Sequence, residues 1–196
     1  AIAEWFDTDL VETVARANPD FDIHLCGAVT AEAPARLAKL DNVTLHGEIA
    51  YADVPAFLMS MDVLIIPFQL LPIIKACDPV KFYEYSAVRK PTVSTALPEL
   101  NRAGGLVTIA HDAQGFAAGI RAAAERSTDP VRGSALRAYA LENAWSYRAA
   151  HMLAEMERAP TVSVVVLAYG SADLTLDCLH SLVGEGEVYP ALEVLV

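Results

Sequence analysis

The chain has 196 residues, which is enough for one sizeable domain or for one domain and part of another. Hydrophobic residues make up 54% of the chain and charged residues 20%, a composition that excludes an intrinsically disordered protein. The net charge is −11 and no cluster of lysines and arginines occurs, which disfavours a nucleic-acid-binding or membrane-surface protein. Any anionic ligand must therefore be held by local donors.

The longest apolar runs are Val63–Pro67 and Val162–Ala168. Both are far shorter than the ~20 residues of a membrane-spanning helix, so they predict buried strands and no membrane span. The cysteines Cys26, Cys77 and Cys178 are widely spaced and show no metal-binding spacing. We therefore expect buried free thiols, no metal site at the cysteines, and a cytoplasmic location.

Short apolar runs alternate with amphipathic stretches from the start of the chain. The predicted strands are Phe21–Cys26, Val43–Leu45, Val63–Ile66, Thr92–Ser94 and Leu106–Ile109. The predicted helices are Asp9–Asn18, Pro34–Leu40, Val54–Met61, Pro79–Val88 and Gln114–Arg126. This alternation predicts an α/β domain with a Rossmann-like, doubly wound parallel sheet, in which Val63–Ile66 is central.

Two longer helical patterns, Pro130–Glu142 and Ala144–Arg158, follow, and the chain then breaks at Pro160. After the break the pattern restarts with a strand, a helix at Ser171–Val183 and a second strand at Leu192–Val196. We therefore predict one domain over residues 1–158 and the initial β-α-β fragment of a second domain over residues 161–196.

The residues at the two ends of the chain predict that the fold is truncated at both ends. Ala1–Ala3 has the character of a strand's last residues, and Val196 falls within an apolar strand. The first strand of a doubly wound sheet is central, and unpaired buried backbone groups are costly. We expect either low stability or repair of the sheet by Val162–Leu167, within the chain or in a strand-swapped dimer.

The segment from Asp78 to Thr95 is the most informative. Asp78 suits a helix N-cap and Pro79 the first helical position. The helix that follows is apolar over most of its surface, yet Lys81 and Glu84 lie one turn apart on one face. One interpretation is a ligand site at the carboxyl edge of the sheet, with Lys81 on phosphates and Glu84 on ribose hydroxyls. The other is a solvated ion pair, and an ionised Asp78 would repel a diphosphate there.

Three further positions have two interpretations each. Pro67 follows a predicted strand and either borders the ligand cleft or simply ends the strand. Gly47 either lets the backbone approach a base or serves a turn. Asp7 either caps the first helix or lines the cleft. The histidines have no partner at the spacing of metal ligands or a catalytic triad, so we expect them to be structural or exposed.

The stretch from Val63 to Thr95 resembles the donor-binding domain of GT-B glycosyltransferases, close to glycosyltransferase family four. That family has a strand ending in proline, then a helix P-x-K-x-x-E-Y-x-A, then G-K-P-V-V. The residues that fit are Pro67, Pro79, Lys81, Glu84, Tyr85, Ala87, Lys90 and Pro91. The resemblance extends loosely over residues 1–158, which would be one half of a GT-B fold.

The resemblance implies a glycosyltransferase that binds a nucleotide-sugar donor as its substrate and needs no metal or other cofactor. Glu84 would bind the ribose and Lys81 the diphosphate. The other implied donor-binding residues are Pro67, Asp78, Val80 and Gly47. Two positions depart from the family pattern: Ala76 stands where many members have a glutamate, and Arg89 where a glycine is usual.

Residues 161–196 resemble the opening of a family-two, GT-A glycosyltransferase, which implies a tandem enzyme in polysaccharide biosynthesis. In a GT-B enzyme the acceptor is bound by an N-terminal domain, so the present chain alone should be inactive. Two alternatives keep the same fold: a non-catalytic nucleotide-binding or interaction module, and a GT-B-fold nucleotide-sugar epimerase.

Overall fold

The computed structural model describes residues 2–28, 34–158, 161–168, 170–183 and 192–196. The chain divides into two compact units, Ala1–Asn143 and Ala144–Val196, which are described separately. Pro160, the predicted domain boundary, lies outside the described residues. The division into residues 1–158 and 161–196 therefore stays a prediction.

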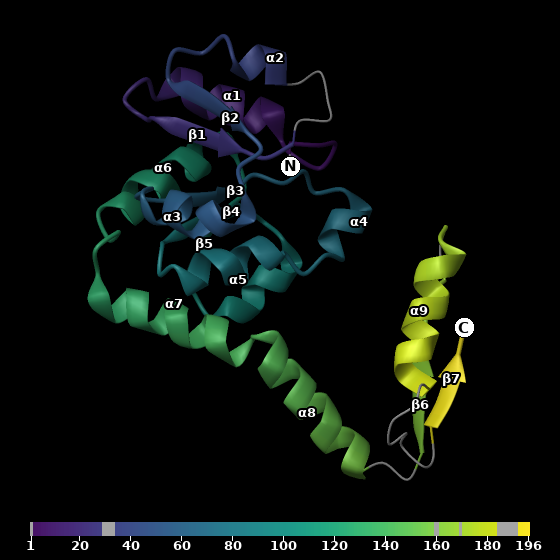
Figure 1. Cartoon of the computed structure of the whole chain (residues 1–196). Helices are drawn as coiled ribbons and strands as arrows, with labels where there is room; N and C mark the ends of the chain where they lie inside the picture. Colours follow the sequence, from purple (N-terminus) through teal and green to yellow (C-terminus); the bar gives the residue numbers. More distant parts are fainter. Residues whose placement is uncertain (1, 29–33, 159–160, 169, 184–191) are drawn as a thin grey trace. The chain divides into compact units, whose positions relative to one another are not determined.

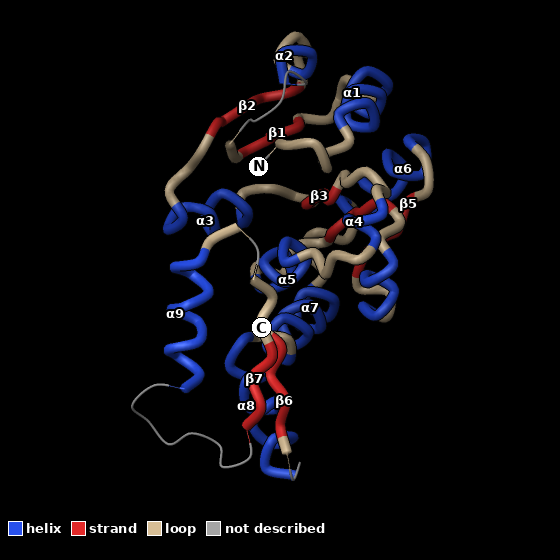
Figure 2. Tube along the Cα trace, turned by 90° about the vertical axis from the view of Figure 1, so that its right-hand side faces the viewer, coloured by secondary structure: helices blue, strands red, loops and turns tan. Residues whose placement is uncertain are grey.

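The first unit alternates strands and helices as predicted, and all strand pairs among its described residues are parallel (Figures 1 and 2). Its strands are β1 (Ile23–Cys26), β2 (Val43–Gly47), β3 (Leu64–Ile66), β4 (Thr92–Thr95) and β5 (Val107–Ala110). Its α-helices are α1 (Thr8–Ala17), α2 (Pro34–Leu37), α3 (Val54–Met59), α4 (Pro72–Lys75), α5 (Val80–Ala87), α6 (Ala113–Ala124) and α7 (Pro130–Glu142). Short 3₁₀ helices span Tyr51–Asp53 and Pro98–Ala103. The Rossmann-like α/β class is therefore confirmed.

One feature of the sheet differs from the prediction. The strands form two groups, β1–β2 and β3–β4–β5, so β3 lies at an edge and not at the centre of one sheet. No strand among the described residues lies between β1 and β3. The expected replacement within the chain is also not seen, because β6 (Val162–Val165) pairs with β7 (Leu192–Leu195) in the second unit.

The β3–β4–β5 group is covered by helices on both faces. Consecutive strand residues point to opposite faces, and the packing follows that rule. Ile66 packs in one cluster with Phe82 of α5, whereas Ile65 packs in another with Phe116 of α6. Val93 of β4 is fully buried on the α6 side. The apolar, doubly covered strands expected from the sequence are thus observed.

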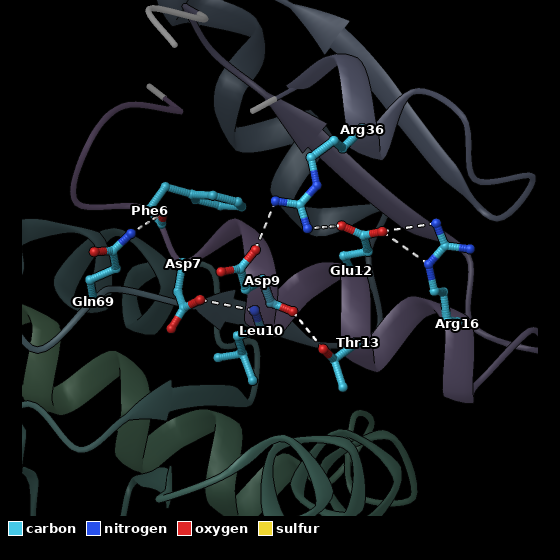
Figure 3. Close-up of polar contacts among 9 residues, drawn as sticks. All are labelled: Phe6, Asp7, Asp9, Leu10, Glu12, Thr13, Arg16, Arg36 and Gln69. Atoms are coloured by element: carbon cyan, nitrogen blue, oxygen red, sulfur yellow. Dashed lines mark hydrogen bonds and ion pairs between the residues drawn. The ribbon is translucent and has the colours of Figure 1, made fainter. Parts of the chain in front are cut away.

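Helix α1 connects the two strand groups. Val11 and Ala15 pack against β1 and β2, while Val14 packs with Phe116 of α6. On its outer side, Arg36 of α2 forms ion pairs with Asp9, at 2.9 Å, and with Glu12 (Figure 3). One helix therefore contributes to both hydrophobic cores.

Arg121 of α6 makes a second connection, to the loop before β1. Its guanidinium donates to Asp20 at 2.8 and 2.9 Å and to the side chain of Asn18 at 2.9 Å. The same group lies 4.6 Å from the ring centroid of Phe21. A planar guanidinium suits this combination of bidentate pairing and stacking.

The second unit contains α8 (Trp145–Arg158), β6, α9 (Ala172–Val183) and β7. Strands β6 and β7 pair in parallel with α9 between them in sequence, so residues from Val162 to Leu195 include the predicted β-α-β elements. Among the described residues of both units, no helix combines the length and the apolar character needed to cross a membrane.

Helix α5 ends in a Schellman motif. The N–H of Arg89 donates to Ser86 at 3.0 Å, and the N–H of Lys90 donates to Tyr85 at 3.2 Å. Arg89 has a φ of 62°, in the left-handed region that favours glycine. The arginine that departs from the resembled family pattern therefore occupies a position where glycine would be unstrained.

Replacing Arg89 by glycine should raise the free energy of unfolding by roughly 0.5–1 kcal/mol. Relief of the left-handed backbone conformation contributes about 1–2 kcal/mol, and the greater freedom of glycine in the unfolded chain offsets part of it. Urea denaturation measures the change. Arg89→Ala is the matched control, since it removes the side chain but keeps the β-carbon; equal stabilisation by both variants would contradict the explanation.

Candidate functional site

The carboxyl ends of β1 and β3 meet the first residues of the chain. The N–H of Ile2 donates to Ala28, just after β1, at 2.8 Å. The N–H of Asp7 donates to Pro67, just after β3, also at 2.8 Å. The side chain of Gln69 donates to the carbonyl of Phe6 at 3.3 Å (Figure 3). Doubly wound folds bind ligands at this edge of the sheet. Here the loops at that edge are joined to one another by hydrogen bonds.

Asp7 is held by the first turn of α1. Its Oδ1 accepts a hydrogen bond from the N–H of Leu10 at 2.9 Å, the geometry of an N-cap (Figure 3). Of the two interpretations from the sequence, the helix cap is the one that the structure supports.

The start of α5 differs from the prediction. Pro79 is extended, with φ −76° and ψ 99°, so it takes the cap position itself and the helix begins at Val80. Asp78 is not the cap; its carboxylate accepts hydrogen bonds from the Tyr83 hydroxyl at 2.9 and 3.0 Å. Pro79 itself makes no side-chain cap hydrogen bond. The Asp78 carboxylate is thus bound by a tyrosine hydroxyl, and the expectation that Asp78 is the N-cap residue of α5 was wrong.

Lys81 and Glu84 project together from α5. The Lys81 Nζ lies 3.4 Å from Glu84 Oε2, with side chains 49% and 33% exposed. A pair this exposed contributes little to stability. Both groups are therefore available for a ligand at little cost in folding energy.

A cavity of about 740 Å³ reaches this position. Lys81, Pro67, Tyr85 and Cys26 are among the residues that line it. Burial raises the pKa of the Cys26 thiol, and the positive charge of Lys81 partly opposes that shift. Burial, followed by the charges of Glu84 and Cys26, raises the pKa of the Tyr85 hydroxyl. At neutral pH these two groups are protonated, so Lys81 supplies the charge on this part of the cavity wall, and Glu84 is paired with it.

The other predicted donor-binding residues have distinct surroundings. Val80 is 58% exposed at the start of α5, and Pro67 is buried behind the end of β3. Gly47 ends β2 with a φ of 68°, and its carbonyl accepts from Gly27 at 2.6 Å. The left-handed backbone accounts for this glycine without a ligand, and its role beside a base stays a prediction.

Two of the histidines, His24 and His46, lie close together in the structure. His24 Nδ1 lies 2.9 Å from His46 Nε2, and His24 Nε2 lies 3.1 Å from Asp22. These residues are on neighbouring strands, 22 positions apart, a pairing that no local spacing indicates. Among the described residues, no group of three or more histidine, cysteine, aspartate or glutamate side chains is placed to hold a metal ion.

Comparison with known proteins gives a family match and one relative. The family model "Glycosyl transferases group 1" matches residues 3–126. The chain is also similar to the "Putative teichuronic acid biosynthesis glycosyltransferase TuaH" of Bacillus subtilis (strain 168), with 27% identity over 99 residues. That match spans 49% of the present chain and 25% of the relative.

Substitution of Asp7 tests its role as a cap. Asp7→Ala should lower the free energy of unfolding by about 1 kcal/mol, because the N–H of Leu10 loses its acceptor. Asp7→Asn retains a side-chain oxygen and should keep most of the stability. Thermal or urea denaturation of both variants provides the measurement, and an asparagine variant as unstable as the alanine variant would argue against capping.

The expectation of buried thiols was wrong for Cys77 and Cys178, which are exposed. The environment of Cys26 predicts its reactivity. Cys26 should be alkylated more slowly at neutral pH than Cys77 and Cys178, because it is partly buried with a raised pKa and the other two are exposed. Peptide mapping by mass spectrometry after timed treatment with a thiol reagent gives the three rates. Reaction of Cys26 as fast as Cys77 would mean that its thiolate is not disfavoured.

Proposed function

We propose a donor-binding role for this chain, which belongs to the glycosyl transferases of group 1. Its chemistry is therefore glycosyl transfer. The proposal concerns the unit Ala1–Asn143, which would bind a nucleotide-sugar donor at the start of α5.

The Lys81–Glu84 pair on α5 is the observation that supports this role. The pair lies on the first turns of a helix whose N-cap residue, Pro79, makes no side-chain cap hydrogen bond. Lys81 of the pair lines a cavity that Pro67 also lines, just after the end of β3. Helix N-termini stabilise anions through their partial positive charge and their free donors.

The proposed contacts follow from charge. The ammonium of Lys81 and the first N–H groups of α5 would bind the diphosphate, which becomes the leaving group. Stabilising the negative charge that develops there lowers the barrier to transfer. The carboxylate of Glu84 would accept hydrogen bonds from two ribose hydroxyls, with Val80 and Gly47 nearer the base. A separate domain would supply the acceptor.

The alternatives keep the same binding site. A non-catalytic module would bind the nucleotide without transferring the sugar. An epimerase would need acid and base groups at the sugar, and the Asp22–His24–His46 cluster lies on β2, β1 and the residue before β1, not on α5. Product analysis of the full-length protein with a nucleotide sugar and an acceptor distinguishes them. Transfer releases a nucleoside diphosphate and a glycosylated acceptor, whereas epimerisation inverts one sugar carbon and keeps the nucleotide–sugar bond. The finer assignments, including the start of a GT-A domain at residues 161–196, polysaccharide biosynthesis and a cytoplasmic location, are part of this proposal.

Calorimetric titration with a panel of nucleotide sugars tests the site. Against the ligand that binds best, Glu84→Gln should weaken affinity by about one to two orders of magnitude, since a hydrogen bond to a charged group contributes roughly 1.5–3 kcal/mol. Lys81→Ala should weaken binding of the nucleotide sugar and of the nucleoside diphosphate, but much less that of the free nucleoside.

Glu99→Gln is the matched control. Glu99 forms an i,i+3 ion pair with Arg102 at 2.9 Å, and its side chain is 29% exposed, close to that of Glu84. This variant removes a similar pair away from α5 and should bind like the wild type. If Glu84→Gln and Lys81→Ala also bind like the wild type, the pair is only a solvated ion pair and the proposal fails.

A further inference from the structure

Two histidine rings meet on one face of the β1–β2 pair. His24 of β1 and His46 of β2 have ring centroids 5.1 Å apart, and the Nδ1 of His24 lies 2.9 Å from the Nε2 of His46. A histidine nitrogen that carries a lone pair is a common ligand for metal ions. The fold therefore brings together two potential ligand atoms from residues that are 22 positions apart in the sequence.

The strands and one helix hold these rings in place. His24 lies between two buried apolar residues of β1, and the alternation of side chains along a strand turns it to the opposite face. The register of β1 against β2 shifts after Leu25, and His46 is the residue of β2 without a direct partner on β1. Bulges of this kind redirect a side chain. Phe57 of α3 contacts the His46 ring edge-on, with ring centroids 5.2 Å apart.

Asp22 determines which nitrogen of His24 carries a proton. Its Oδ2 lies 3.1 Å from the Nε2 of His24, and an ionised carboxylate can only accept hydrogen bonds. A neutral His24 therefore has its proton on Nε2 and its lone pair on Nδ1, toward His46. Ligating histidines commonly have this arrangement, in which a carboxylate binds the second ring nitrogen and orients the first.

The positions of the two rings fit a single tetrahedral metal ion. Two imidazoles bound to Zn²⁺ at about 2.0–2.1 Å have nitrogens about 3.4 Å apart and ring centres about 5 Å apart. The observed ring centres already have that separation, and the nitrogens are closer, at 2.9 Å, because they face one another. Turning the rings would direct both lone pairs to one point without separating the strands. His46 is exposed and the His24 side chain is 23% exposed, so solvent reaches the pair.

We propose that His24 and His46 together bind one divalent transition-metal ion of the Ni²⁺, Cu²⁺ and Zn²⁺ group, with water in the remaining positions. Imidazole nitrogen suits these ions. Asp22 orients His24 and is not a third ligand, because it meets the ring nitrogen that does not face His46. The site thus has two protein ligands, which agrees with the finding that no larger group of ligands is placed for a metal among the described residues. This inference goes beyond the proposed function and does not depend on it, because it involves no contact with a nucleotide.

Calorimetric titration of the whole chain with zinc chloride tests the proposal, on protein without a histidine tag. A single equivalent should bind. His46→Gln removes a ligand and should weaken binding by about 100-fold, whereas Asp22→Asn should weaken it by about tenfold, the lower end for an outer partner, because Asp22 is 76% exposed. His111→Gln is the matched control, since it changes an exposed histidine outside the pair, and it should bind like the wild type.

Three results would overturn the proposal. The first is no binding at millimolar zinc, and the second is equal affinity in His46→Gln and the wild type. The third is displacement of zinc by excess magnesium chloride, because Mg²⁺ prefers oxygen ligands and the chain has 25 aspartate and glutamate residues. His24→Gln provides a second test of the pair if His46→Gln does not fold, and thermal denaturation without metal shows whether each variant is folded.

Discussion

The pairing of backbone hydrogen-bonding groups is the constraint on which this architecture depends. Parallel strands buried on both faces have no water to satisfy their N–H and C=O groups, so every edge must be paired, covered or left accessible. Among the described residues of the unit Ala1–Asn143, strands pair within each group, and no strand pairing joins the two groups. The unit is therefore joined across the gap by side chains and helices. Helix α1 shares its apolar face between both cores, and Arg121 connects α6 to Asp20.

The same constraint explains what could be predicted from the residues. Strands covered on both faces must be apolar throughout, so runs such as Val63–Ile66 could be recognised in the sequence. The observed bounds of these strands differ from the predicted ones by a residue or two. The order of strands within a sheet is set by contacts between distant segments, which local patterns do not report. The central position expected for β3 failed for that reason. Helix α4 was missed because its four residues are too few to show a helical period.

The candidate site shows a similar division. The Lys81–Glu84 spacing predicted a shared face of α5, and the two side chains do project together. The cap at the start of that helix depended on the backbone angles of Pro79, which turn the chain so that Asp78 meets Tyr83. The His24–His46 contact depended on the register of β1 against β2. Positions within one helix were thus predictable, whereas contacts that depend on a turn or on strand pairing were not.

In the part of the chain that the structure describes, β1 and β3 each have one edge without a strand partner, and this affects how the protein behaves at high concentration. An unpaired strand edge is a template for other extended chains, and proteins usually guard it with charged residues or proline. The sequences of these two strands, IHLC and LII, contain neither. Protection against association then falls to the net charge of −11, whose repulsion is screened within about 10 Å at 0.1 M salt. Colloidal stability is therefore expected to be greatest at low ionic strength and well above the isoelectric point near 4.8.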